Sequence, residues 1–409
     1  MKIIIIGSVI AGNSVIHKLV DTESDVQITA YEKGRFMACG TYGLPYYLGK
    51  KESSIGEIIA HKREELEKEN IQINYCHEVI GLDVAVKRVT IKNLRTNESF
   101  IDTYDKLIIA TGSTSLIPHV PGADKMGVHV LNSVEDLIFL KEFTKTPYVS
   151  DIAILGGDFA GLEIAKAFLK LGRNVRLIEE STRLLPSFDT EVASHIMKEL
   201  KAQGMEVILG ARVTGFTGGT FVENVQTDKG TYPCDLVIPT NITRPNTFLL
   251  QHTPIAHDEQ GAIIIDKELK TSISDIYAIG GCTAPIENPE ETLSLHIAQM
   301  EMARTGMSEE QAIQKGLAIQ TVMKVANDRP SICPNPNQIA IKLIYEAQTH
   351  KILGAQAWGK KNVCARINAL AVAIAAGMTT EALAQVNFIY SSSTNTMWDP
   401  IQVACHAVR

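Results

Sequence analysis

Apolar residues form short continuous runs that alternate with amphipathic stretches along the first 300 residues. An isoleucine run at residues 2–6 is followed by a glycine turn, a stretch with helical spacing, and a second apolar run ending at Glu32. Residues 151–179 repeat this order and end at Glu179. Continuous apolar runs of this length are typical of strands buried in a parallel sheet. The pattern predicts two βαβ repeats in an α/β protein.

The glycines of both repeats have the spacing of a dinucleotide-binding turn. In the first repeat Gly7 opens the turn, Gly12 permits close helix packing, and Glu32 ends the second strand. The corresponding residues of the second repeat are Gly156, Gly161 and Glu179. A helix N-terminus offers free N–H groups to a pyrophosphate, and the acidic residue accepts hydrogen bonds from an adenosine ribose. A carboxylate there disfavours a 2′-phosphate, so the pattern favours NADH over NADPH.

The rest of the chain contains a predicted linker near residue 115 and a different pattern of elements beyond residue 300. An apolar run ends in Ala110-Thr111-Gly112 and is followed by a linker with several prolines, which predicts a domain boundary near residue 115. A β-meander is expected over residues 213–233. Beyond residue 300, the stretch 338–359 predicts two antiparallel strands and the stretch 362–386 two helices. This last part is expected to be a separate α+β domain.

Composition narrows the class of protein. The chain has 409 residues, of which 45% are hydrophobic and 21% charged, with a net charge of -7. These values fit a soluble protein of two or three domains and offer no basic field for nucleic acid or an anionic membrane. The seven cysteines are scattered and never form a C-x-x-C pair, which argues against a disulfide framework and a structural zinc site. We expect a cytoplasmic protein that binds small molecules and holds no metal.

Several short motifs occur in a fixed order along the chain. They include "YEKG", "GLPYYLG", "YDKLIIATGS", "GLEIA", "RLLPSFD", "TRPNT", "DIYAIGG" and "YSSSTNTMWDP". Together with the two glycine turns, they resemble the pyridine nucleotide-disulfide oxidoreductases, specifically the single-cysteine branch of coenzyme A-disulfide reductases, NADH oxidases and NADH peroxidases. The resemblance covers nearly the whole chain.

The resemblance implies two Rossmann-like nucleotide-binding domains, for FAD and NAD, and a C-terminal α+β dimerisation domain. The FAD domain would comprise residues 1–114 and 244–300, the NAD domain residues 115–243, and the dimerisation domain residues 301–409. In the family, NADH reduces the flavin, and the flavin exchanges electrons with one cysteine that lies against its ring. The implied partners are a small-molecule electron acceptor and a second copy of the chain.

The family's cofactor contacts map onto positions of this chain. The expected FAD-binding residues are Gly7, Val9, Ile10, Gly12, Glu32, Lys33, Val79, Ala110, Thr111, Gly112, Gly281 and Ala298. The expected NADH-binding residues are Gly156, Asp158, Phe159, Gly161 and Glu179. Tyr390 matches a tyrosine with which the partner subunit often borders the site, and the alternative is a packed aromatic at the dimer contact. Ile10 stands where NADH oxidases and peroxidases place a histidine, which argues against a standard peroxidase mechanism.

The redox residue can be aligned in two ways. Counting from Glu32 without gaps places Tyr42 at the position of the family's cysteine, so that the thiol would be absent. Alternatively, residues 36–40 reproduce the family's F-x-x-C-G string, and Cys39 would be the thiol if the loop shifts by three residues. Three residues span ~10 Å of extended chain, so the two alignments exclude each other.

Three further features depart from the family pattern. Asp158 replaces the middle glycine of the second turn, and a carboxylate ~4 Å from a phosphate at an effective dielectric near 20 costs about 4 kcal/mol. Gly281 replaces an aspartate that hydrogen-bonds the ribityl chain of the flavin. The run at residues 294–312 omits about a helix and a strand that relatives have.

Two hypotheses follow. The chain is an FAD-dependent enzyme that passes electrons from NADH to a disulfide of the coenzyme A type, or to oxygen or peroxide. Alternatively, it is a degenerate relative that binds FAD but lacks the thiol at the flavin and has impaired NADH binding.

Overall fold

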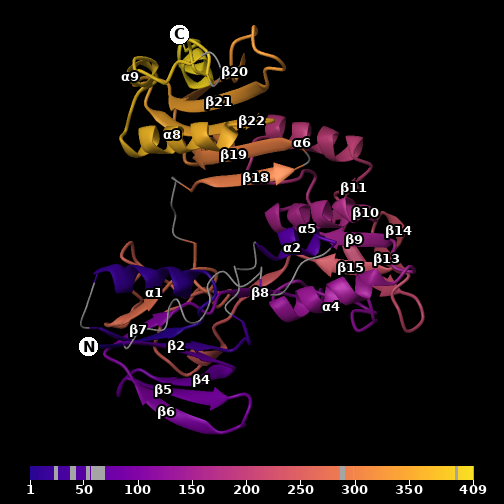
Figure 1. Cartoon of the computed structure of the whole chain (residues 1–409), viewed down its shortest axis with the longest axis vertical. Helices are drawn as coiled ribbons and strands as arrows, with labels where there is room; N and C mark the ends of the chain where they lie inside the picture. The colour runs from indigo at the N-terminus through magenta and orange to yellow at the C-terminus, as the bar shows by residue number, and fades with distance from the viewer. Residues whose placement is uncertain are drawn as a thin grey trace. The chain divides into compact units, whose positions relative to one another are not determined.

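The computed structural model describes residues 1–22, 26–36, 43–51, 56, 70–285, 291–297, 299–391 and 395–408 (Figure 1). The chain divides into two compact units. The first comprises Met1–Gly156, Ala167–Val175 and Val213–Ile286, and the second comprises Gly157–Lys166, Arg176–Arg212 and Glu287–Arg409.

The first unit contains a five-stranded parallel sheet that begins with the isoleucine run. Its order is β17-β7-β1-β2-β3, and α1 (Ala11–Thr22) connects β1 to β2. The strands are β1 (Lys2–Ile6), β2 (Gln27–Glu32), β3 (Ile71–Tyr75), β7 (Lys106–Ile109) and β17 (Ile276–Ala278). Ile4 and Ile6 contribute to the core on one face, and Ile3 and Ile5 to the core on the other. Burial on both faces explains the continuous apolar run.

Smaller elements complete the first unit. They are an antiparallel sheet of β4 (His77–Asp83), β5 (Arg88–Asn93) and β6 (Ser99–Thr103), the pair β8 (Ser113–Ser115) and β16 (Thr243–Pro245), helices α2 (Leu44–Leu48) and α4 (Val134–Lys145), and η3 (Phe248–Leu250). The meander predicted over 213–233 is present as β12 (Val213–Thr217), β13 (Asn224–Thr227) and β14 (Gly230–Pro233).

The second repeat of the sequence also folds as strand, helix and strand. It consists of β9 (Asp151–Leu155), α5 (Phe159–Lys170) and β10 (Asn174–Glu179). It is followed by α6 (Thr190–Ala202), β11 (Glu206–Leu209) and β15 (Leu236–Pro239). β15 pairs with β9 and β10 pairs with β11, both in parallel. The predicted α/β fold with two βαβ repeats is confirmed.

A five-stranded antiparallel sheet dominates the second unit. Its order is β18-β19-β22-β21-β20, with β18 (Leu293–Ile297), β19 (Met300–Gly306), β20 (Ile319–Asn327), β21 (Gln338–Glu346) and β22 (Ile352–Gly359). The helices of this part are α7 (Glu309–Gln314), α8 (Val363–Ala375), α9 (Thr380–Ala384) and α10 (Pro400–Cys405). The predicted strand pair over 338–359 and the two helices after it are confirmed. β18 ends at Ile297 and pairs with β19, which begins at Met300, the last residue of the predicted FAD domain.

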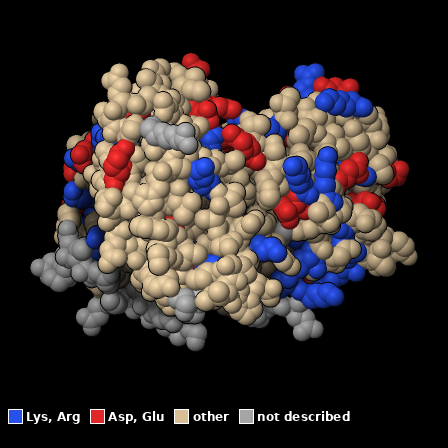
Figure 2. Space-filling view, turned by 90° about the horizontal axis from the view of Figure 1, so that it is seen from above, with Lys and Arg blue, Asp and Glu red and all other residues tan. Residues whose placement is uncertain are grey.

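Two general features bear on partners and ligands. None of the helices in the described ranges is long and apolar enough to cross a bilayer. The face shown in Figure 2 is covered mostly by residues without charge, with acidic and basic side chains interspersed over much of it.

Candidate functional site

The first glycine turn is tightly enclosed by backbone. Gly7 has a φ of 90°, and a Cβ atom on it would lie 2.4 Å from the carbonyl oxygen of Ala110. A Cβ atom on Gly12 would lie 1.9 Å from the carbonyl oxygen of Gly7. Only glycine fits at either position, because these approaches are to backbone atoms that cannot move aside. The start of α1 is therefore held directly against the turn.

Glu32 closes this turn from the end of β2. It is only 8% exposed, and its Oε2 atom accepts hydrogen bonds from the N–H of Ser8 at 2.8 Å and from the Ser8 hydroxyl at 3.3 Å. Its Oε1 atom accepts the N–H of Gly34 at 2.8 Å. A carboxylate has about four lone-pair sites, so Glu32 retains acceptor capacity for a ribose hydroxyl. Sequence reasoning missed Ser8 and Gly34, which bind Glu32 mainly through backbone N–H groups.

The second turn reproduces this arrangement. The N–H of Gly157 donates to Oε2 of Glu179 at 2.5 Å, and the N–H of Ser181 donates to Oε1 at 2.7 Å. Gly156 has a φ of 121°, and a Cβ atom on it would lie 2.5 Å from Oγ1 of Thr240. The repeat seen in the sequence thus extends to the same pair of hydrogen bonds on the same carboxylate oxygens.

Asp158 gives the second turn a property that the first lacks. Its Oδ1 atom accepts the backbone N–H of Gly161 at 2.9 Å, at the start of α5. From the sequence, this carboxylate is predicted to repel a phosphate unless it turns away or is protonated. In the structure the Asp158 carboxylate also accepts one of the N–H groups that a helix N-terminus offers to an anion. That N–H group is therefore already hydrogen-bonded before a phosphate binds.

The end of β7 presents an unusual hydroxyl beside the first turn. The carbonyl oxygens of Thr111 and Gly112 accept hydrogen bonds from the side chain and the backbone of Asn246, both at 2.9 Å. Oγ1 of Thr111 is buried and has no hydrogen-bond partner within the described ranges. Buried polar atoms are nearly always paired, so this hydroxyl fits a polar ligand bound at the turn.

Gly281, the replacement for the family's aspartate, lies just after β17. A Cβ atom on it would lie 2.8 Å from Oγ and 3.2 Å from the backbone nitrogen of Ser113. The Ser113 side chain therefore occupies the space that a side chain on residue 281 would need. Sequence reasoning missed Ser113, because the two residues are far apart in the chain.

The remaining predicted contacts are spread over both units. In the first, Lys33 forms a 2.7 Å ion pair with Glu78, and Val79 is buried on β4. At the start of α1, Val9 is half-buried and Ile10 is 43% exposed. In the second, the Phe159 ring lies 5.9 Å from that of Phe188. Cys39, Tyr42 and Ala298 lie outside the described residues, so the two alignments of the redox residue stay open.

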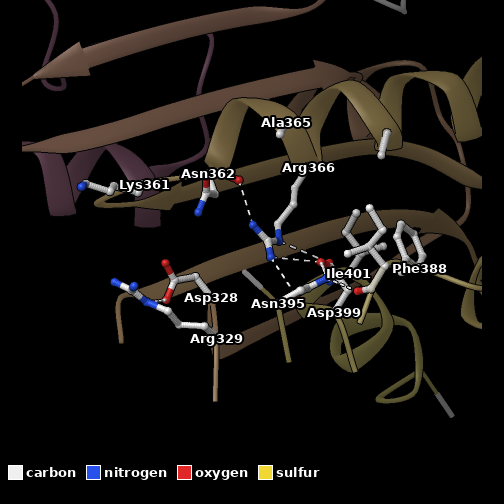
Figure 3. Close-up of a pocket in the computed structure, with 12 residues that line it drawn as sticks. Asp328, Arg329, Lys361, Asn362, Ala365, Arg366, Phe388, Asn395, Asp399 and Ile401 are labelled. Atoms are coloured by element: carbon white, nitrogen blue, oxygen red, sulfur yellow. Dashed lines mark hydrogen bonds and ion pairs between the residues drawn. The ribbon is translucent and has the colours of Figure 1, made fainter. Parts of the chain in front are cut away.

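Tyr390 lies on the segment before α10 and is 61% exposed. This segment borders a cavity of about 560 Å³ in the C-terminal part of the chain (Figure 3). The buried guanidinium of Arg366 on α8 contacts Asp399 at 3.0 Å and Asn395 at 3.1 Å. The side chain of Asn395 in turn donates to the carbonyl oxygen of Ile389 at 2.9 Å. These contacts fix the backbone on which Tyr390 is carried.

Two glycine turns closed by carboxylates, together with a C-terminal α+β domain, define a class of oxidoreductases with two dinucleotide sites. The family model "Pyridine nucleotide-disulphide oxidoreductase" matches residues 1–312, and the model of that family's dimerisation domain matches residues 294–400. The chain belongs to this family, as the motifs predicted.

Similar proteins cover the chain from end to end. An NADH oxidase of Enterococcus faecalis is 26% identical over 100% of this chain and 99% of its own length, and a CoA-dependent NAD(P)H sulfur oxidoreductase of Pyrococcus abyssi is 27% identical over 100% and 98%. Among solved structures, the water-forming NADH oxidase from Lactobacillus brevis bound to NADH has a TM-score of 0.91 at 26% identity, covering 100% of this chain and 98% of that one. An NAD-dependent persulfide reductase from A. fulgidus has a TM-score of 0.91 at 27% identity, covering 99% and 82%.

The family and these relatives are FAD-dependent NAD(P)H oxidoreductases, so the chain is an oxidoreductase of this class with FAD and NAD(H) as cofactors. The residues present fit these groups. The backbone-enclosed Gly7 turn and the unpartnered Thr111 hydroxyl suit FAD, and the Glu179 turn suits a nicotinamide dinucleotide. The individual cofactor contacts remain predictions.

Proposed function

We propose that this protein passes electrons from NADH through FAD to a disulfide of the coenzyme A type, or to oxygen or peroxide. The observation that carries the proposal is the duplicated turn, in which Glu32 and Glu179 each accept one N–H from the glycine turn and one from two residues further on. We assign FAD to the first turn and NADH to the second.

The chain's own residues would bind and orient the two cofactors. The N–H groups at the starts of α1 and α5 bind pyrophosphates, and the free lone pairs of Glu32 and Glu179 accept ribose hydroxyls. Glu179 also selects NADH, since its carboxylate repels the 2′-phosphate of NADPH. When bound at the first turn, FAD would supply the redox chemistry.

Two classes of electron acceptor are supported by the relatives. Proteins of similar sequence are named as NADH oxidases and as a CoA-dependent sulfur oxidoreductase, at nearly the same identity. In a disulfide mechanism Cys39 is the thiol that exchanges with the acceptor. In an oxidase mechanism the chain transfers electrons to oxygen.

The working form is a homodimer. Its support is the match of residues 294–400 to a dimerisation domain and a group of exposed apolar side chains in that part of the chain. These include Ile332, Val372, Ile389, Met397 and Trp398, all more than half exposed. Burial of such side chains against a second copy would remove apolar surface from water and stabilise the dimer. Tyr390 lies among them in sequence and would border the partner's flavin.

One observation favours a second candidate function, a relative that keeps FAD but uses NADH poorly. It is the hydrogen bond from the N–H of Gly161 to Asp158, which holds a carboxylate at the start of α5, the position that we assign to the pyrophosphate of NADH. On this alternative FAD is a structural or sensing ligand.

Anaerobic titration of the purified protein with NADH distinguishes the two. The first function predicts loss of the oxidised flavin's visible absorbance, and it is overturned if the absorbance persists at millimolar NADH. Cys39→Ser then separates the acceptors. Loss of disulfide turnover with retained flavin reduction supports the thiol mechanism, whereas unchanged turnover of every disulfide tried removes Cys39 from it.

A further inference from the structure

Three buried polar residues form a row across the C-terminal sheet. Arg304 on β19 lies opposite Gln356 on β22, and Gln356 lies opposite Lys342 on β21. They are 2%, 1% and 2% exposed, in strands whose other buried residues are mostly apolar. Burying two cations is costly unless each is paired. The groups that pair with Arg304 and Lys342 therefore indicate which part of the chain these residues hold in place.

All three residues hold the segment that follows β10. We call residues 180–189 the connecting loop, which leads from β10 to α6. Lys342 Nζ lies 3.0 Å from Oδ2 of Asp189 at the end of this loop. Gln356 Oε1 accepts the Asp189 N–H at 3.0 Å, and Arg304 donates to the carbonyl oxygen of Ser187. The sheet thus binds the loop through its backbone and its terminal carboxylate.

Lys342 is surrounded by acceptors from three elements. Besides Asp189, its ammonium lies 3.2 Å from Glu191 on α6 and 2.6 Å from Glu309 on α7. Burial alone would lower the pKa of Lys342, but its hydrogen bonds to Glu309, Asp189 and Glu191 and the charge of Asp189 together outweigh burial and raise that pKa. The lysine therefore stays charged at neutral pH and holds the end of the loop electrostatically.

The other side of the connecting loop contacts the second glycine turn. The N–H of Leu185 donates to the carbonyl oxygen of Gly157 at 2.9 Å, and Leu184 packs so closely that a Cβ atom on Gly157 would lie 2.5 Å from its Cδ2. Phe188 packs against Phe159. Leu185 has a φ of 47°, a left-handed conformation that a leucine adopts only when its surroundings impose it.

We propose that Lys342, Arg304 and Gln356 are positioning residues that set the affinity for NADH, by holding the connecting loop against the Gly157 turn from the C-terminal sheet. This inference rests on the proposed binding of NADH at that turn. The physical basis of the inference is that the connecting loop contacts the C-terminal sheet on one side and the Gly157 turn on the other. Loosening the anchor at Asp189 and Ser187 frees Leu184, Leu185 and Phe188, so that binding must order them again at a cost in affinity.

The test compares Lys342→Met with Lys324→Met, which removes the same charge from an exposed position on β20. The dissociation constant of NAD⁺, the KM for NADH, kcat and the FAD content are measured for each protein. In Lys342→Met the dissociation constant and KM should rise about tenfold, a size typical of coupling between sites. FAD content should be unchanged, kcat at saturating NADH should change less than twofold, and Lys342→Arg should restore most of the affinity. Lys324→Met should match the wild type.

An unchanged dissociation constant in FAD-loaded Lys342→Met overturns the inference. If that variant does not fold because three carboxylates are left facing one another, Gln356→Met decides, since it removes the acceptor for the Asp189 N–H without changing charge. It should raise the dissociation constant about threefold, and no change overturns the inference. A wild-type protein that binds neither NAD⁺ nor NADH contradicts the proposed function instead, so the two failures are distinguishable.

Discussion

The carboxylate of Asp158 accepts a hydrogen bond from the backbone N–H of Gly161, 2.9 Å away, at the first turn of α5. This side chain provides internally the negative charge that a helix N-terminus attracts. In the first repeat the residue at the same point of the turn is Val9, which has no such group. The two turns therefore differ in their readiness for a pyrophosphate, although their glutamates are bound alike.

Asp158→Gly should strengthen the binding of NADH. The substitution frees the Gly161 N–H and removes a negative charge from the phosphate site, so the dissociation constant should fall at least about tenfold, corresponding to about 1.4 kcal/mol. Loss of the helix cap should cost only about a few tenths of a kcal/mol of stability, because glycine is itself tolerated at this position. Fluorescence titration with NADH measures the first effect and urea unfolding the second.

Glu259→Gln, which removes a charge from an exposed position, should bind NADH like the wild type. Equal or weaker binding by Asp158→Gly would show that the carboxylate does not oppose the cofactor.

The two glutamates should control different cofactors. Glu32→Gln should lose FAD during purification, and Glu179→Gln should retain FAD but show a KM for NADH raised about tenfold, since a hydrogen bond to a charged group contributes about 1.5–3 kcal/mol. Glu179→Gln should also discriminate less against NADPH, because the carboxylate that repels its 2′-phosphate is gone. Flavin absorbance and steady-state kinetics with both nucleotides provide the measurements.

Each glutamate variant serves as the control for the other, because both remove the same charge from equivalent positions. If both variants lost FAD and NADH binding together, the assignment of one cofactor to each turn would be wrong.

The local pattern of the chain was sufficient to predict much of this fold. The runs ending at Glu32 and Glu179 predicted both βαβ repeats, because a strand, a glycine turn and a helix are encoded by neighbouring residues. The strand pair at 338–359 was predicted for the same reason. These features depend on periodicity over short windows, which a single sequence displays.

What the sequence did not reveal depends on contacts between distant residues. Ser113 lies against Gly281, and Lys342 binds Asp189, across more than 150 positions of the chain. A signal was present in the second case, since Lys342 is the only charged residue within the apolar run 339–345. Its partner, however, is set by the packing of the sheet against the connecting loop.

Gly281→Ala should destabilise the FAD-binding part of the chain. The added methyl group would lie 2.8 Å from Oγ of Ser113 and 3.2 Å from its backbone nitrogen, and overpacking of this kind costs about 1–3 kcal/mol. Gly219→Ala is the matched control, because a Cβ atom there meets nothing within 4 Å. Thermal unfolding followed by flavin fluorescence should show a lower midpoint for Gly281→Ala alone. Adding Ser113→Gly should recover at least half of the loss, and a failure to recover would mean that Ser113 is not the obstacle.

Thiol reactivity should separate the cysteines by burial and pKa. Cys76, Cys234, Cys282 and Cys405 are buried, and burial raises the pKa of Cys405 to about 12. Burial and the nearby Glu301 raise the pKa of the half-buried Cys364 thiol as well.

Because the thiolate is the reactive form, its fraction at pH 8 is lowered wherever the pKa is raised, and it grows about tenfold per pH unit below that pKa. In native protein at pH 8, iodoacetamide followed by mass spectrometry should therefore label the half-buried Cys333 and Cys364 before the buried cysteines, and Cys405 only after unfolding. Raising the pH to 9 should accelerate Cys364 about tenfold. A fast phase that survives Cys333→Ser and disappears in Cys39→Ser would identify Cys39 as the reactive thiol of the proposed mechanism, whereas labelling of Cys405 as fast as Cys333 in the native state would contradict its burial.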